Sequence, residues 1–164
     1  MTRLRSLLAS PWLTVRVQIA LGAIFVAASL PKLVDPPSFA HMIYNYRLVP
    51  GPFVNAAALF MPWLELLCGV ALVLGIWRRP AAAIIGAMLV VFIVAISINL
   101  GRDNAVNCGC FDITAANKSH DELIEEMWWV VTRDVGMLLM VAQILWASRQ
   151  RPENLQDRAV AGAN

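Results

Sequence analysis

Residues 81–100 read AAAIIGAMLVVFIVAISINL, twenty consecutive residues without a charged side chain. A helix of this length spans about 30 Å, the thickness of the hydrocarbon core of a bilayer. Three more apolar segments of similar length lie at about 13–30, 53–77 and 127–147. Because none of them has the strict alternation of a barrel strand, the sequence predicts an all-α integral membrane protein, a four-helix bundle. We expect a single four-span membrane domain over residues 1–150, followed by a polar C-terminal tail over residues 151–164.

The composition excludes most soluble functions. Apolar residues make up 59% of the 164-residue chain and charged residues only 15%, so the partner that the sequence itself implies is the lipid bilayer. The segments between the spans leave no room for a separate catalytic domain, a nucleotide-binding unit or a nucleic-acid surface. The formal net charge of +2 is also too small to argue for a polyanionic partner, and we expect no nucleic acid among the partners.

The distribution of basic residues predicts the orientation, because short cytoplasmic loops retain Lys and Arg. If the N-terminus is inside, seven basic residues are cytoplasmic and four lie on the other side. The seven are Arg3, Arg5, Arg78, Arg79, Arg149, Arg151 and Arg158, and the four are Lys32, Arg47, Arg102 and Lys118. We therefore expect both termini in the cytoplasm of a bacterium, the spans in its inner membrane, and the two longer connections in the periplasm. Residues 13–30 are interpreted as a span because this apolar stretch is longer than the apolar core of a signal peptide, which has about 7–15 residues.

Several local signals divide the chain further. We expect the first span to stop at Pro31, and residues 78–80 (RRP) to form a tight turn between the second and third spans. Ser119 and Glu122 have the spacing of a capping box, which predicts a helix start. Between the first two spans, apolar residues recur at helical spacing and predict a short amphipathic helix on the membrane surface. They are Phe39, Met42, Ile43 and Tyr46.

Two of the three cysteines are separated by a single glycine. Cys108 and Cys110 fall in the second periplasmic connection of the predicted topology, an oxidising compartment in which thiols tend to pair. Gly109 permits the bend that so small a ring needs, and a strained, exposed bridge is of the kind that exchanges. The alternatives are a structural clip or two reduced thiols. A metal site is a weaker interpretation, because no four-ligand set is recognisable. Cys68, inside the second span, is expected to be a small buried apolar side chain.

Six polar or charged side chains are expected in one half of the bundle. Glu65, Arg133 and Asp134 lie inside predicted spans, where facing lipid costs on the order of a few kcal/mol each, so they should point inward and pair. The other three lie at the periplasmic ends of spans, and they are Lys32, Asn99 and Arg102. One interpretation is a pocket beneath the Cys-Gly-Cys segment that tunes a thiolate or moves protons. The other is an ion-pair network that only fixes helix packing.

These motifs together resemble the MauE family of methylamine-utilisation membrane proteins, within the wider DoxX-like group. The resemblance covers residues 13–147 and rests on the glycine-to-lysine stretch 22–33, residues 46–50 (YRLVP), 62–65 (PWLE), 108–111 (CGCF) and 133–134 (RD). It implies a redox-associated membrane protein that works with periplasmic thioredoxin-like partners in maturing a disulfide-rich enzyme subunit. The residues that it implies are Cys108 and Cys110 as the redox pair, with Lys32, Glu65, Arg133 and Asp134 as the pocket.

The chain departs from the family after this motif. The family usually continues CGCF with glycine, whereas this chain has Asp112. A carboxylate two residues from Cys110 disfavours the Cys110 thiolate, which makes Cys108 the better residue for the first attack.

Three hypotheses of function follow. The first is a membrane thiol–disulfide relay or maturation factor that acts with a periplasmic thioredoxin-like protein or a client through Cys108 and Cys110. A lipid quinone as its electron acceptor rests on analogy alone. The alternative is a non-catalytic accessory or assembly subunit of a larger respiratory or redox complex, which packs on other membrane subunits through Ala and Gly positions. The third is a small-solute or metal carrier that uses Glu65 and the cysteines.

Overall fold

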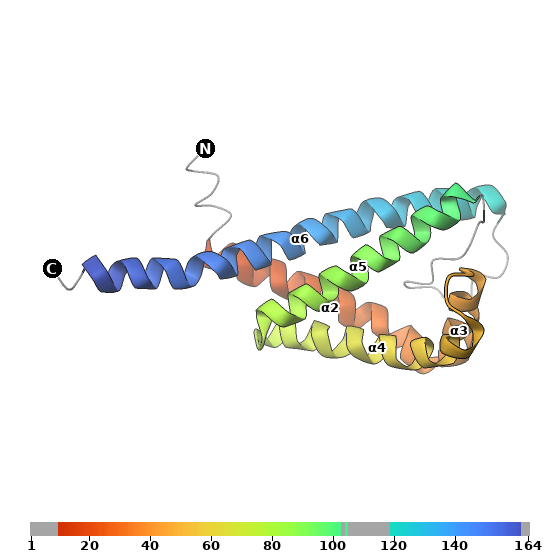
Figure 1. The fold of residues 1–164 in the computed structure, drawn as a ribbon, viewed down its shortest axis with the longest axis horizontal. Coiled ribbons are helices and arrows are strands. Elements are labelled where there is room, and N and C mark those ends of the chain that lie inside the picture. Colours follow the sequence, from red (N-terminus) through yellow and green to blue (C-terminus); the bar gives the residue numbers. More distant parts are fainter. Residues whose placement is uncertain (1–9, 103, 105–118, 162–164) are drawn as a thin grey trace.

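The computed structural model describes residues 10–102, 104 and 119–161, and Figure 1 shows their arrangement. These residues form five helices and, within the ranges given, no strand. Four are long: α2 (Pro11–Val34), α4 (Gly51–Leu74), α5 (Arg78–Gly101) and α6 (His120–Ala161). Each of these is long and apolar enough to cross a membrane, which confirms the predicted four spans and the all-α class. The fifth, α3 (Pro36–Asn45), is short and joins α2 to α4.

The long helices pack as two pairs. α2 lies mainly against α4, and α5 lies mainly against α6. Figure 1 shows the pairs close together at the α4–α5 turn and apart at the opposite end, where α3 lies. We call these the narrow end and the wide end. At the narrow end α2 also contacts α6, and the Gln143 side-chain amide donates a hydrogen bond to Thr14 Oγ1 over 3.2 Å.

Glycine allows the backbones of α2 and α4 to approach closely. A Cβ atom added to Gly22 would lie 2.6 Å from the carbonyl oxygen of Gly69, and one added to Gly69 would lie 2.9 Å from the carbonyl oxygen of Gly22. Close approach at small residues is the usual way in which membrane helices gain packing contacts. The α2–α4 pair is therefore held by backbone contact as well as by the apolar cluster around Leu21 and Leu72.

The turn between α4 and α5 lies three residues earlier than expected. α4 ends at Leu74 because Gly75 takes a left-handed conformation, with φ of +71°, and its N–H donates to the Leu72 carbonyl. Residues 78–80, which were expected to form the turn, are instead the first turn of α5. Pro80 fits there because the first N–H groups of a helix have no partner inside the helix.

α2 also continues past its expected end. Pro31 lies inside the helix, which ends at Val34, so the prediction of a stop at Pro31 was wrong. A proline in the last turn removes only one backbone hydrogen bond, and here the helix ends soon after it. The N–H of Asp35 donates to the Pro31 carbonyl, and the Asp35 carboxylate then accepts hydrogen bonds from the Ser38 N–H and hydroxyl. Asp35 thus ends α2 and caps the first turn of α3.

Helix α3 confirms the predicted amphipathic helix but not its position on the membrane surface. Phe39 and Met42 are buried against Ala58 of α4. Tyr46, which follows the helix, is 8% exposed and packs with Ile96 and other residues of α5 and α6. The apolar face of α3 therefore covers the wide end of the bundle, since the separation of the two pairs leaves room for it there.

The predicted capping box is confirmed at the start of α6. The Ser119 N–H donates to the Glu122 carboxylate over 2.9 Å, and the Glu122 N–H donates to the Ser119 hydroxyl over 3.4 Å. This reciprocal pair satisfies two N–H groups at the helix start. It fixes the point at which α6 begins.

Candidate functional site

A buried ion pair joins α2 to α4. The ammonium of Lys32 donates to both carboxylate oxygens of Glu65, each over 2.8 Å, and the two side chains are only 8% and 10% exposed. The same ammonium lies 5.3 Å from the centre of the Phe39 ring, within the range of a cation–π contact. The sequence predicted that Glu65 would find a partner inside the bundle. That partner is Lys32, which was expected among the pocket residues but was not identified as the partner of Glu65.

The Lys32 side chain points along the helix toward the narrow end. Gly22 and Gly69 touch, and so mark one level of the antiparallel α2–α4 pair. At 1.5 Å per residue, Lys32 lies about 15 Å from that level and Glu65 about 6 Å from it, in the same direction. The two side chains and the hydrogen bonds between them therefore span a difference of about 9 Å between the levels of their backbones. A lysine at the end of a span usually extends toward water, so the ion pair outweighs that preference here.

A second ion pair lies on α6. Arg133 donates from Nε over 3.1 Å and from a terminal nitrogen over 2.9 Å, both to Oδ1 of Asp134. Asp134 is 1% exposed, and its other oxygen, Oδ2, is buried without a hydrogen-bond partner in the described part of the chain. The Lys32 ammonium lies within electrostatic range of this carboxylate. Asp134 therefore has one satisfied oxygen and one free acceptor.

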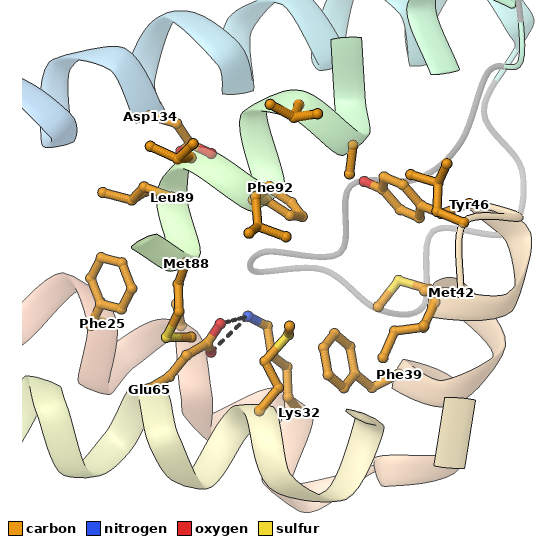
Figure 2. Close-up of a pocket in the computed structure, with 18 of the residues that line it drawn as sticks. Phe25, Lys32, Phe39, Met42, Tyr46, Glu65, Met88, Leu89, Phe92 and Asp134 are labelled. Carbon is orange, nitrogen blue, oxygen red and sulfur yellow. Dashed lines mark hydrogen bonds and ion pairs between the residues drawn. The ribbon is translucent and has the colours of Figure 1, made fainter. Parts of the chain in front are cut away.

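The two ion pairs lie on opposite walls of one cavity, shown in Figure 2. The cavity has a volume of about 530 Å³ and lies between the α2–α4 and α5–α6 pairs, with α3 at its end. Apart from these four charged side chains, the described residues of its walls are almost entirely apolar, with several aromatic rings and methionines. Among them are Phe25, Phe39, Met42, Tyr46, Met88 and Phe92.

The remaining two predicted pocket residues lie outside this cavity. Asn99 is fully buried near the end of α5, where its amide donates to the Ala95 carbonyl and its oxygen accepts from the Asn104 side chain. Arg102 follows α5 and is exposed. Four of the six predicted residues, Lys32, Glu65, Arg133 and Asp134, thus line one cavity, while Asn99 holds the end of α5 in place.

The predicted redox cysteines, Cys108 and Cys110, lie outside the described residues. The described residues nearest to them along the chain are Asn104 and Ser119. The Asn104 side chain reaches the Asn45 carbonyl at the end of α3, and α6 starts just after Ser119, so both belong to the wide end. Cys68 is 6% exposed among apolar neighbours, as predicted.

Sequence reasoning missed some polar groups and most of the cavity. Gln18 of α2 is 2% exposed, and its side-chain oxygen has no hydrogen-bond partner in the ranges that the structure covers. The sequence could have indicated this residue, because an amide side chain in an apolar span is expected to face other helices. The aromatic and methionine lining gave no such signal, because these residues are equally common in a packed core or against lipid. Among the described residues no three His, Cys, Asp or Glu side chains gather closely enough to hold a metal ion.

Comparison with known proteins identifies similar chains. The family model described as methylamine utilisation protein MauE matches residues 10–147. The chain is 35% identical over 142 residues to the methylamine utilization protein MauE of Methylorubrum extorquens, covering 86% of this chain and 73% of that one. It is 33% identical over 108 residues to the protein of that name from Methylophilus methylotrophus, covering 65% of this chain and 57% of that one. The match thus spans little more than half of the Methylophilus protein. No solved structure matches the chain.

Proposed function

The chain belongs to the MauE family of membrane proteins, and we propose that it serves methylamine utilisation as a thiol–disulfide relay or maturation factor. In this proposal Cys108 and Cys110 exchange disulfides with a periplasmic thioredoxin-like protein or with a client protein. The observation that carries it is the Cys-Gly-Cys sequence, since two thiols separated by one glycine close a small ring of the exchanging kind.

The exchange balances as two thiol–disulfide steps. A thiolate of the partner attacks one sulfur of the Cys108–Cys110 bridge, which forms a mixed disulfide and releases the other cysteine as a thiolate. The second thiolate of the partner then attacks the mixed disulfide, so the partner leaves with a disulfide and this chain holds two thiols. Two electrons and two protons have moved to the chain. Its reoxidation needs an acceptor of the same two electrons and two protons, for which we propose a lipid quinone, reduced to the quinol.

The positions of the described residues on either side of the cysteine segment support this proposal. Asn104 and Ser119 both belong to the wide end, where the cavity and its ion pairs also lie. A segment that starts and finishes there is well situated to work with the cavity.

The location is part of the proposal. The count of basic residues favours the inner membrane of a bacterium, with both termini in the cytoplasm and the Cys-Gly-Cys segment in the periplasm. A membrane-impermeant maleimide applied to intact spheroplasts, after reduction, should then label Cys108 and Cys110. Cys68, which is buried in the bundle, should remain unlabelled. Labelling that requires lysis of the spheroplasts would contradict the orientation.

Trapping the mixed disulfide tests the exchange. Because the exchange is reversible, the Cys108 thiolate of the Cys110→Ser variant can attack the disulfide of the oxidised partner. With no Cys110 thiolate to release the partner, a mixed disulfide that reductant removes should accumulate in cells growing on methylamine. Cys68→Ala is the matched control, because it removes a thiol from the bundle and should leave the wild-type adduct pattern. If neither Cys108→Ser nor Cys110→Ser yields an adduct, and both support growth on methylamine as the wild type does, the relay is wrong.

That outcome would favour a non-catalytic accessory subunit. The observation behind this second function is the exposed surface of the spans, since only 28–33% of the residues in an apolar 18-residue stretch of each span are buried within the chain. Faces of this kind contact lipid or other membrane subunits. The accessory role predicts that the chain remains bound to membrane partners through purification, with or without Cys108 and Cys110.

A further inference from the structure

We propose that the cavity between the two helix pairs binds an uncharged, lipid-soluble phenol or hydroquinone, with its hydroxyl group on Asp134 and an oxygen on Lys32. Use of such a ring as an electron carrier rests on the function proposed above. Binding itself does not, because it requires neither Cys108 nor Cys110. The two can therefore be measured separately.

One carboxylate oxygen of Asp134 has no hydrogen-bond partner among the described residues. A buried acceptor without a hydrogen bond is rare in native proteins, and each one costs about 1–3 kcal/mol, more when the group is charged. Asp134 Oδ2 is such an acceptor, in a side chain that lines the cavity and is 1% exposed. A ligand that brings an O–H donor would satisfy it. An alkane chain or an aprotic lipid ester would not.

The charge of the cavity indicates that the ligand is uncharged. The described residues of its walls include two positive and two negative side chains, already arranged as the Lys32–Glu65 and Arg133–Asp134 pairs. Their formal charges cancel. A charged ligand would add an uncompensated charge to an apolar enclosure, which is costly. Amines and carboxylic acids are therefore poorer ligands than a neutral hydroxyl compound.

Lys32 supplies the complementary donor. An ammonium has three N–H groups, and Lys32 uses two of them on the two oxygens of Glu65. The third can donate to a hydroxyl or carbonyl oxygen of a bound molecule. Figure 2 shows Asp134 and the Lys32–Glu65 pair facing the cavity from opposite walls. A ring with oxygens on opposite sides, as in a hydroquinone, matches one acceptor and one donor placed in this way.

The apolar lining favours a ring over an aliphatic alcohol. Phe25, Phe39 and Phe92 present aromatic faces or edges, and Met42 and Met88 contribute polarisable sulfur. The volume of about 530 Å³ lies within the range of roughly 300–1,000 Å³ typical of small-molecule sites. It can hold the ring and part of an apolar tail, while the rest of the tail extends into lipid.

Equilibrium binding to the full chain in nanodiscs free of quinone tests the site. The probe is decyl-hydroquinone, kept reduced, and empty nanodiscs of the same lipid give the background from partitioning. We expect saturable binding of about one ring per chain. Asp134→Asn replaces an acceptor oxygen by an amide N–H₂ donor and should weaken binding about tenfold or more, the loss of one hydrogen bond to a charged group.

Two alanines on α2 provide a control that leaves every polar group in place. Ala28 lines the cavity, whereas its neighbour Ala27 is exposed on the surface of α2. Ala28→Phe should abolish saturable binding by filling the cavity, and Ala27→Phe should leave it unchanged. If the Asp134→Asn variant does not fold, the two alanine variants still test whether the ligand binds in the cavity. Uptake that is unsaturable, or equal in both alanine variants, would overturn the proposal.

Two further arms identify the ligand class and separate the two proposals. Decanol carries a hydroxyl on an aliphatic body, so saturable binding of decanol as tight as that of the hydroquinone would overturn the assignment to a ring. The variant with both Cys108→Ser and Cys110→Ser should bind decyl-hydroquinone with unchanged affinity. If the wild-type chain binds decyl-hydroquinone but neither single cysteine variant yields a mixed disulfide or loses growth on methylamine, the site is supported and the relay is rejected.

Discussion

Lys32→Met removes one charge of the buried pair and leaves the Glu65 side chain, which is 10% exposed, in an apolar cavity without its partner. Breaking a buried pair from one side costs about 3–5 kcal/mol, because the remaining charge is not compensated. Both hydrogen bonds between the side chains, of 2.8 Å each, are lost together with the contact to Phe39. Glu65→Met leaves the ammonium unpaired in the same way, and we expect a loss of similar size.

The double variant should be far more stable than the sum of the single variants implies. With both residues replaced by methionine neither position carries an unpaired charge, and apolar replacements of buried pairs are often neutral or stabilising. We expect the free energy of unfolding of the double variant to lie within about 2 kcal/mol of the wild type. The coupling energy of the cycle is then about 4 kcal/mol or more.

Unfolding in mixed micelles, with the mole fraction of a denaturing detergent as variable and helicity by circular dichroism as readout, measures all four proteins. Arg16→Met is the matched control, since Arg16 lies on the same helix and is exposed. It should change the free energy of unfolding by about 0.5 kcal/mol or less. Single-variant losses that simply add in the double variant would refute the reasoning, and so would a Lys32→Met protein as stable as the control.

Two more predictions concern the helices around the cavity. Gly22→Ala and Gly69→Ala should each lower the free energy of unfolding by about 1–3 kcal/mol, since the new methyl group meets the facing backbone, whereas Gly136→Ala, with nothing within 4 Å, should be neutral or stabilising. Equal stability of all three variants in the same micelle assay would contradict the close contact of α2 and α4. The Ser38 hydroxyl and N–H hold the pKa of Asp35 below its usual 3.8, so the cap is fully present above that pH and is lost as the pH falls through the lower folded value. Hydrogen exchange of α3 amides, corrected for the intrinsic rate, should show protection that falls in this acid range in the wild type, and a profile identical to that of Asp35→Ala would exclude the cap as its cause.

The sequence was sufficient to predict the spans and to place charges inside them. Uninterrupted apolar length is a direct consequence of bilayer thickness, so four segments could be recognised without knowledge of their packing. The same reasoning predicted that Glu65 and Asp134 point inward, because facing lipid is costly. Both are buried.

The pairing of these charges could not be predicted in the same way. Depth counted along a helix treats a side chain as a point, whereas the side chains of Lys32 and Glu65 together span a difference of about 9 Å between their backbone levels. The cavity depends on the angle between two helix pairs, which no single residue encodes. The position of the α4–α5 turn depends on one left-handed glycine, Gly75. This residue lies three positions before Arg78, where the sequence predicted the turn to begin.

The length of three of the long helices relates the shape of the cavity to the thickness of the surrounding membrane. α2, α4 and α5 each contain 24 residues and are about 36 Å long, some 6 Å more than the hydrocarbon core of an average bilayer. Helices that are longer than the hydrocarbon core tilt in the membrane, and the tilt angle decreases as longer acyl chains thicken the bilayer. The cavity lies at the wide end, where the two helix pairs diverge. A change in helix tilt with lipid chain length would therefore change the width of the cavity. Affinities for any ligand of this cavity are therefore comparable only between bilayers of equal thickness.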